Sequence, residues 1–250
     1  MNAMSTVNFD TQQSTEFCSK HQANHVVYRG RSICKQCSFE LLDRGQKEHH
    51  HAVNTMVRDK HFADAKLPLR HAQSGFGNYL VSNDGQRNAK AQCMSFAKDF
   101  MGGVVRNLIM VGRTGTGKTH LSSAVALNVL DKRKSARYIT SEDMANEIAN
   151  AWKRTDDSEA NAIYRFTDYD LLILDEYGLH DRQENRLQLV HKVLYSRYDE
   201  GKATMLISNF TLDELKKDLG DRLWSRFQHD GLTLVECNWG DQRMMQGESV

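Results

Sequence analysis

The sequence predicts an α/β fold in three layers around a mainly parallel sheet, with a small metal-binding module in front of it. Short apolar segments alternate with segments of helical periodicity, which is the pattern of such a sheet and its covering helices. A glycine-rich phosphate loop joins one apolar segment to the helix that follows it. Cysteine and histidine residues near the N-terminus predict the module. The 250 residues suffice for both parts.

The composition narrows the classes of protein without naming a partner. The chain has 33 lysine and arginine residues against 32 aspartate and glutamate residues, so any contact with nucleic acid must come from a local patch. No apolar segment has membrane-spanning length, and residues 1–16 are too polar for a secretory signal. We therefore expect a cytoplasmic protein with no membrane partner. In that reducing compartment, the five cysteines favour metal binding or free thiols over disulfides.

Metal-ligating residues near the N-terminus follow the pattern C-x₂-H-x₁₂-C-x₂-C. Two ligand pairs on tight turns suit a tetrahedral Zn²⁺ site with three thiolates and one imidazole. The expected ligands are Cys18, His21, Cys34 and Cys37. His25 is an alternative to His21, and unpaired cysteines on a flexible tail are the alternative to a metal site. Apolar residues on both sides of Gly30 indicate a hairpin between the pairs, and so short a segment needs the metal in order to fold.

The chain is expected to divide into four segments. Residues 1–45 form the zinc module, and residues 46–66, which are charged and helix-compatible, form a helical linker. Residues 67–240 form the nucleotide-binding domain, and residues 241–250 form a C-terminal tail.

The phosphate loop is the most specific motif of the chain. Gly112–Thr119 fits G-x-x-x-x-G-K-[ST], between the buried strand expected over 107–111 and a segment of helical periodicity. Its glycines let backbone N–H groups point at phosphate oxygens at a helix N-terminus. Lys118 can reach the β- and γ-phosphates, and the Thr119 hydroxyl can ligate Mg²⁺. The alternative is a glycine-rich turn with a chance lysine. The expected nucleotide-binding residues here are Gly112, Thr114, Gly115, Thr116, Gly117, Lys118 and Thr119.

Two further strands are expected to deliver polar side chains to the same edge of the sheet. The apolar run over 169–174 leads into Asp175, which would hold Mg²⁺, and Glu176, which can act as general base toward water. The run over 203–208 places Asn209 at its tip, where it can orient that water. The alternative is that Asn209 only starts the next turn.

The remaining elements complete the alternation of strands and helices. A strand over 137–140 precedes a helix over 141–152 that we expect Ser141 to cap, and another helix covers 184–200. Thr211 and Glu214 form a capping box for a helix over 212–219, and a last strand covers 232–236.

Two arginines follow the capped helix at a spacing of four, so Arg222 and Arg226 share one face of a helix. Such a pair suits phosphate or the carboxylates of a partner. A solvated basic face is the alternative.

The motifs G-R-T-G-T-G-K-T-H-L, L-L-I-L-D-E-Y-G, I-S-N-F and D-R-L-W-S-R-F, in this order, resemble the DnaC/DnaI-type helicase loaders. These are AAA+ ATPases, and the transposition ATPase IstB is a close relative. The resemblance covers residues 67–239 and implies a P-loop AAA+ core without a full C-terminal lid. It implies that ATP and Mg²⁺ are cofactors, that Asn209 is sensor 1, and that Arg226 is an arginine finger supported by Arg222. Further nucleotide contacts that it implies are His120, Phe76 and Tyr79.

The same resemblance implies binding of single-stranded DNA and self-assembly through ATP-bridged interfaces. The matching element is the helix over 141–152, with Trp152 stacking on a base and Lys153 and Arg154 near phosphates. The alternative for Trp152 is a core tryptophan at a helix end.

Three functions follow for testing. The first is an ATP-dependent loader whose zinc module binds a DnaB-type replicative helicase and helps place it on single-stranded DNA. The second is an IstB-like transposition regulator acting on DNA. The third is an adaptor that binds nucleotide and helicase without hydrolysis. The zinc module favours the first over the second, and the intact Glu176 favours an ATPase over the adaptor.

Overall fold

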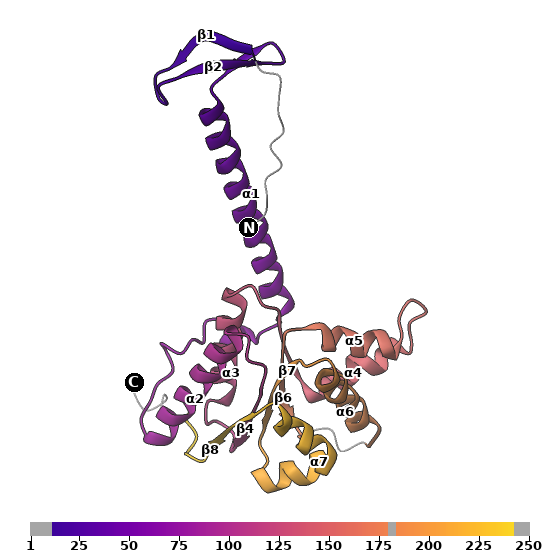
Figure 1. Cartoon of the computed structure of the whole chain (residues 1–250). Coiled ribbons are helices and arrows are strands. Elements are labelled where there is room, and N and C mark those ends of the chain that lie inside the picture. Colours follow the sequence, from indigo (N-terminus) through magenta and orange to yellow (C-terminus); the bar gives the residue numbers. More distant parts are fainter. Residues whose placement is uncertain (1–11, 180–183, 243–250) are drawn as a thin grey trace. The chain divides into compact units, whose positions relative to one another are not determined.

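The computed structural model describes residues 12–179 and 184–242 (Figure 1). The chain divides into two compact units, Met1–Met56 and Val57–Val250. Most of the expected C-terminal tail, residues 243–250, lies outside the described residues. In the part described, no helix is both long and apolar enough to cross a membrane.

The first unit is a three-stranded antiparallel sheet followed by a helix. Strands β1 (Gln12–Cys18), β2 (Ala23–Tyr28) and β3 (Arg31–Ile33) pair in sequence order. The expected hairpin is confirmed, because Arg29 and Gly30 form a two-residue turn with φ of 48° and 75°. The helix-compatible segment belongs to α1 (Lys35–Asp64), a 30-residue helix that begins before Cys37 and has no buried residue.

The second unit contains a five-stranded sheet in the order β5-β6-β7-β4-β8, and all of its pairings are parallel. Its strands are β4 (Asn107–Gly112), β5 (Ala136–Thr140), β6 (Leu171–Tyr177), β7 (Ala203–Ser208) and β8 (Leu232–Cys237). Its helices are η1 (Leu69–His71), α2 (Asp84–Met101), α3 (Lys118–Asp131), α4 (Ser141–Ala151), α5 (Glu159–Asp168), α6 (Glu184–Asp199) and α7 (Leu212–His229).

Helices cover both faces of this sheet, which confirms the three-layer architecture (Figure 1). Successive residues of a strand point to opposite faces. In β4, Leu108 and Met110 therefore join α2 and α3 in one apolar cluster, while Ile109 and Val111 join α4 to α7 in the other. The strands are buried on both faces, which is why they read as continuous apolar runs.

A buried arginine ties helix α6 to α5, to β7 and to the connection between α5 and β6. Arg197 of α6 is fully buried, and its guanidinium donates to carbonyl oxygens that include those of Phe166, Tyr169 and Ala203. Burial lowers its pKa to about 9, so the side chain stays charged at neutral pH. These bonds fix α5, β7 and the residues that lead into β6 around α6, and so support the start of the strand that carries the acidic motif.

Three local expectations need correction or refinement. The cap of α4 is Thr140 and not Ser141, because the Thr140 hydroxyl accepts from the Asp143 N–H while Ser141 is already helical. The strand β6 does not stop at the acidic pair but continues one residue past it, to Tyr177, through an irregular register. The helix from Leu212 is kinked at Gly220, where φ is 70°, so that α7 consists of two helical segments.

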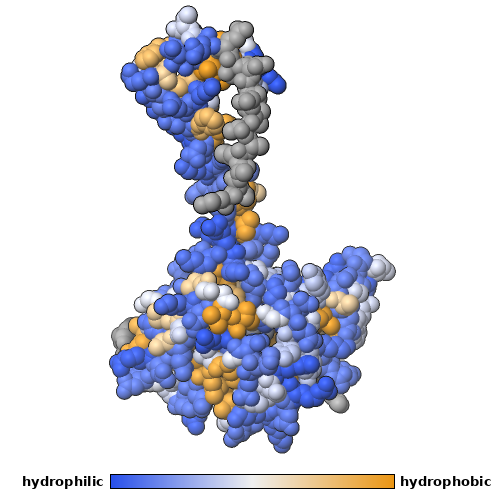
Figure 2. All heavy atoms as spheres, in the orientation of Figure 1, coloured by the Kyte–Doolittle hydropathy of each residue, from blue (hydrophilic) through white to orange (hydrophobic). Residues whose placement is uncertain are grey.

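The surface of the molecule is mainly hydrophilic on the face that Figure 2 shows. In the second unit, the residue that follows α1, Ala65, is fully buried, and its carbonyl accepts from the Tyr138 N–H at 2.8 Å. This bond lies within the second unit and joins residue 65 to the edge strand β5.

Candidate functional site

The phosphate loop connects β4 to α3 as expected, and three of its glycines have positive φ. Gly117 precedes α3 with φ of 87°, and Gly115 has φ of 78°, a region that only glycine adopts without strain. Lys118, which is 7% exposed, donates through Nζ to the carbonyls of Gly112 and Arg113 at 2.6 and 2.8 Å. The loop's own carbonyls therefore hold the ammonium group inside the loop.

Side chains from three neighbouring strands meet at this loop. The Lys118 Nζ also donates to Asn209 Oδ1 at 2.9 Å, and the Thr119 hydroxyl donates to Asp175 Oδ2 at 3.1 Å. Asp175 lies on β6, Asn209 follows β7, and Lys118 follows β4, and these strands are adjacent in the order β6-β7-β4. The predicted phosphate ligand Lys118 thus bonds the predicted sensor Asn209, and the two predicted Mg²⁺ ligands, Thr119 and Asp175, bond each other.

Sequence reasoning missed a fifth member of this group, beside Lys118, Thr119, Asp175 and Asn209. The Tyr138 hydroxyl of β5 donates to Asp175 Oδ2 at 2.5 Å, the same oxygen that Thr119 contacts. Burial, and then the negative charge of Asp175, raise the pKa of Tyr138 above its ordinary value, so it remains a donor. Tyr138 therefore fixes the carboxylate that is the candidate Mg²⁺ ligand. This contact depends on the pairing of β5 with β6, which no local sequence motif predicts.

Glu176 has an unusual backbone for a strand residue, with φ of 57°. A non-glycine residue rarely adopts this left-handed conformation, which is often found where function requires it. The side chain of Glu176 is exposed, while its N–H donates to Asp175 Oδ1 at 2.7 Å. The irregular register of β6 thus directs two consecutive acids differently, with Asp175 buried and Glu176 at the surface.

Of the further nucleotide contacts that the resemblance implies, Tyr79 lies against the loop. Tyr79 is 7% exposed, and a Cβ on Gly117 would lie 3.0 Å from its ring, so the glycine is needed for this contact. Phe76 packs against the cluster formed with α2 and α3. His120 Nε2 lies 3.1 Å from both the Gly75 carbonyl and Asn78 Oδ1, so it holds the segment that carries these aromatic residues.

The two arginines of α7 differ in their surroundings. The Arg226 guanidinium carbon lies 4.5 Å from the ring centroid of Tyr195 and 5.0 Å from that of Tyr198, both on α6. Cation–π contacts at these distances restrict the guanidinium. Arg222 is exposed, while Leu223 and Phe227 are buried.

The expected DNA contacts lie at the end of α4. Trp152 is 60% exposed, so its interpretation as a core tryptophan is wrong, and its Nε1 donates to Glu159 Oε2 at 3.2 Å. Lys153 donates to Asn150, and Arg154 pairs with Asp156 at 3.1 Å, so both cations already have polar partners. A surface cavity of about 620 Å³ lies between α4 and α5, lined by Glu147, Asn150, Ala151, Arg154, Asp156, Asp157, Asn161, Tyr164 and Arg165.

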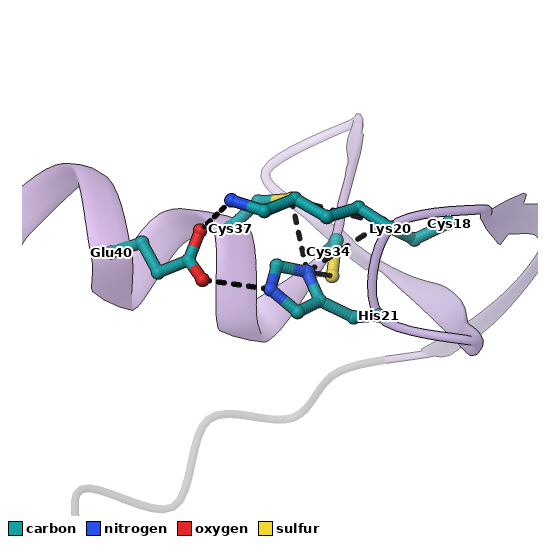
Figure 3. Close-up of polar contacts among 6 residues, drawn as sticks. All are labelled: Cys18, Lys20, His21, Cys34, Cys37 and Glu40. Atoms are coloured by element: carbon teal, nitrogen blue, oxygen red, sulfur yellow. Dashed lines mark hydrogen bonds and ion pairs between the residues drawn. The ribbon is translucent and has the colours of Figure 1, made fainter.

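The four expected zinc ligands converge in the first unit (Figure 3). His21 Nδ1 lies 3.7, 3.5 and 3.3 Å from the sulfurs of Cys18, Cys34 and Cys37, and the sulfurs of Cys18 and Cys37 are 3.7 Å apart. Tetrahedral Zn²⁺ with the usual bond lengths separates two sulfurs by about 3.8 Å and a nitrogen from a sulfur by about 3.6 Å. The geometry therefore fits Zn²⁺. His25 contacts Glu16 and Ser32 instead, so it is not the fourth ligand.

Neighbouring groups shift the pKa values of three of these side chains. The pKa of Cys18 is lowered to about 6, first by a hydrogen bond from the His21 backbone, so its sulfur is a thiolate at neutral pH. Burial raises the pKa of Cys37 to about 11, so metal binding must displace its proton. His21 Nε2 lies 2.9 Å from Glu40 Oε1, and this contact is the main cause that raises the pKa of His21 to about 9 (Figure 3). Sequence reasoning missed Glu40, which lies one helical turn after Cys37.

The sequence of the chain is similar to those of known proteins. The family described as IstB-like ATP binding protein matches residues 24–233. The replicative helicase loader DnaC of Escherichia coli strain K12 is 27% identical over 173 residues, which are 69% of this chain and 70% of that protein. The uncharacterized protein YdaV of the same strain is 27% identical over 225 residues, or 88% of this chain and 89% of that protein.

Solved structures show the same fold. A crystal structure of the DnaC helicase loader has a TM-score of 0.61 at 20% identity and covers 68% of this chain and 99% of that one. A crystal structure of DnaI has a TM-score of 0.57 at 19% identity and covers 71% of this chain and 95% of that one. Both likenesses agree with the expected P-loop AAA+ fold.

Proposed function

The chain belongs to the IstB-like ATP-binding protein family, and we propose that it is an ATP-dependent loader for a DnaB-type replicative helicase. The observation that supports the ATPase part is that Lys118 bonds Asn209 and Thr119 bonds Asp175 at the carboxyl ends of β4, β7 and β6, which are neighbours in the order β6-β7-β4. The similarity to replicative helicase loader DnaC supports the helicase as partner. We also propose that the protein binds single-stranded DNA and that Trp152, Lys153 and Arg154 contact it.

Each residue of the site has a role that its position supports. Bound ATP with Mg²⁺ would supply a phosphoanhydride that water can cleave. The loop N–H groups and Lys118 would bind the phosphates, while Thr119 and Asp175 would hold Mg²⁺, with Tyr138 orienting Asp175. The exposed Glu176 would accept the proton of the attacking water.

Arg226 is the proposed trans-acting finger. Its position on α7 leaves it outside the group around Lys118, and the two tyrosines of α6 hold it at the surface. We propose that it reaches the ATP of a neighbouring subunit, with Arg222 as a supporting charge. Arginine fingers contribute about 10³–10⁵ to turnover in other nucleotidases.

Mixing two inactive variants tests the shared site. Lys118→Ala lacks a working phosphate site but keeps the finger, and Arg226→Ala keeps the site but lacks the finger. We expect each alone to hydrolyse ATP poorly and the mixture to regain a part of wild-type turnover, because one subunit then completes the other. If Arg226→Ala alone is as active as wild type, the finger assignment is wrong.

The zinc module is proposed to bind the helicase. Native mass spectrometry of the protein with its host's DnaB-type helicase, with and without ATP, should show a complex at micromolar concentration. A chain in which Cys34→Ser removes a zinc ligand should lose that complex and keep ATP binding. Absence of any complex with the wild-type chain would rule out the loader.

The family name keeps an IstB-like transposition ATPase as the second candidate. Glu176→Gln separates both ATPases from a pure adaptor, because it should retain ATP binding and lose turnover. Stimulation of turnover by double-stranded rather than single-stranded DNA would favour the transposition role.

A further inference from the structure

The chain that leaves β8 follows the outside of the phosphate loop. Cys237 pairs with Gly112 in the parallel register, and its carbonyl lies so close that a Cβ on Gly112 would clash with it. Beyond β8, Trp239 Nε1 donates to the Thr116 carbonyl at 2.9 Å. The Gln242 backbone N–H donates to the Gly115 carbonyl, also at 2.9 Å. A segment distant in sequence therefore bonds two successive carbonyls of the loop.

The indole of Trp239 is held firmly enough to act as a fixed donor. It packs against the apolar cluster of α2 and α3, and a Cβ on Gly85 would lie only 3.0 Å from the indole ring. An indole N–H can only donate, and here its acceptor is the Thr116 carbonyl. The Tyr79 hydroxyl approaches the same carbonyl at 3.5 Å from the other neighbouring segment.

The planarity of the peptide bond gives these contacts a consequence for nucleotide binding. In a planar trans peptide, the C=O and the N–H of the next residue point in opposite directions. When the Thr116 carbonyl is held outward, the Gly117 N–H must therefore point to the inner side of the loop. The Gly115 carbonyl and the Thr116 N–H are related in the same way.

Without such restraints these peptide planes would turn easily, because the loop is rich in glycine. Gly115 and Gly117 have φ of 78° and 87°, and glycine populates positive and negative φ about equally. A turned peptide would present a carbonyl oxygen to a phosphate oxygen, and the two would repel. Fixing the planes before the nucleotide arrives avoids that ordering cost at binding.

We propose that Trp239, together with the backbone N–H of Gln242, is a positioning residue that aims the N–H groups of the phosphate loop. This rests on the proposed function only in that the loop binds ATP. The role is predicted to affect nucleotide affinity rather than the hydrolytic step.

Two matched pairs of variants test this in the full-length protein. Trp239→Phe keeps an aromatic ring and removes the N–H, and Trp224→Phe is its control on α7. Gln242→Pro removes the backbone N–H, and Gln242→Ala keeps it. We expect Trp239→Phe and Gln242→Pro each to raise the dissociation constant for ATP about three- to tenfold, which corresponds to one lost hydrogen bond. Both controls should bind ATP as the wild type does.

The readouts separate positioning from a general loss of structure. Turnover at saturating ATP should change less than twofold in both test variants, so that KM rises while kcat is kept. The indole N–H of Trp239 should exchange slowly with solvent in the nucleotide-free protein. Unchanged ATP affinity in Trp239→Phe and Gln242→Pro would overturn the inference, while a wild-type chain that binds no ATP would overturn the proposed function instead. If Trp239→Phe lowers the melting temperature markedly, the Gln242 pair decides alone.

Discussion

The two units of this chain obtain their order in opposite ways. Among the described residues of the first unit only Cys18 and Cys34 are buried, and both are candidate zinc ligands. The second unit buries two large apolar clusters, one on each face of its sheet. The fold of the first unit therefore depends on one metal site, whereas many packed side chains stabilise the fold of the second. A single substitution can therefore unfold the first unit but only destabilise the second.

The largest effect is expected from Cys34→Ser. Structural Zn²⁺ contributes about 10–16 kcal/mol of binding free energy in zinc-finger peptides, and that free energy is what folds them. The loss of one thiolate should therefore unfold β1 to β3 and leave the melting of the second unit unchanged. Zinc per chain by elemental analysis and amide exchange of the three strands measure the two outcomes.

Cys93→Ala is the matched control, because Cys93 is fully buried in the second unit, in the cluster formed with α2 and α3. It should destabilise the second unit and leave the zinc content at its wild-type value. If Cys34→Ser keeps slow amide exchange in β1 to β3, the first unit holds itself together without the metal and the contrast between the units is wrong.

A smaller effect in the first unit is expected from Glu40→Gln. The Glu40 carboxylate accepts from His21 Nε2 and so fixes the ring with Nδ1 toward the three sulfurs. Loss of such a partner weakens metal binding about 10- to 100-fold in other proteins. Competition with a chelator should show that weakening, with the sheet still folded at saturating zinc.

Glu48→Gln is the control for this experiment, because Glu48 lies on the same helix and is exposed. It should bind zinc as tightly as the wild type does. Equal zinc affinity in Glu40→Gln and the wild type would mean that the four ligands need no support from Glu40. The fold of this unit would then depend on the four ligands alone.

Short sequence patterns predicted the features that depend on residues close together in the sequence. The zinc ligands, the phosphate loop and the five parallel strands each follow from a short motif or an apolar run, and the structure places them as expected. The cap of α4 was wrong by one residue because Thr140 and Ser141 are both good caps, and only the backbone decides between them.

Contacts between distant segments were not predictable in the same way. Tyr138 reaches Asp175 because β5 pairs with β6, and Trp239 reaches Thr116 because β8 lies beside β4. Each depends on strand order, which a motif does not contain. The left-handed backbone of Glu176 is also invisible in sequence, because glutamate shows no preference for it.

The smallest effect is expected at the capping box of α7, where the second unit should show its tolerance. The Thr211 hydroxyl accepts from the Glu214 N–H, and the Glu214 carboxylate accepts from the Thr211 N–H at 2.8 Å. Thr211→Ala should lower the free energy of unfolding of the second unit by about 1 kcal/mol. Denaturant unfolding measures this, and zinc content should not change.

The same box gives the second unit a pH dependence of known sign. The Thr211 backbone N–H, and then its hydroxyl, lower the pKa of Glu214 below its ordinary value. The stabilisation is therefore complete above the ordinary pKa and is lost as the pH falls through the lowered one. The difference in stability between wild type and Glu214→Ala should accordingly be larger at pH 7 than in acid, where the zinc site has also lost its metal because its ligands are protonated. A difference that grows on acidification would show that the carboxylate destabilises α7. The packing of the apolar clusters, without any contribution from this helix cap, would then account for the greater tolerance of the second unit to substitution.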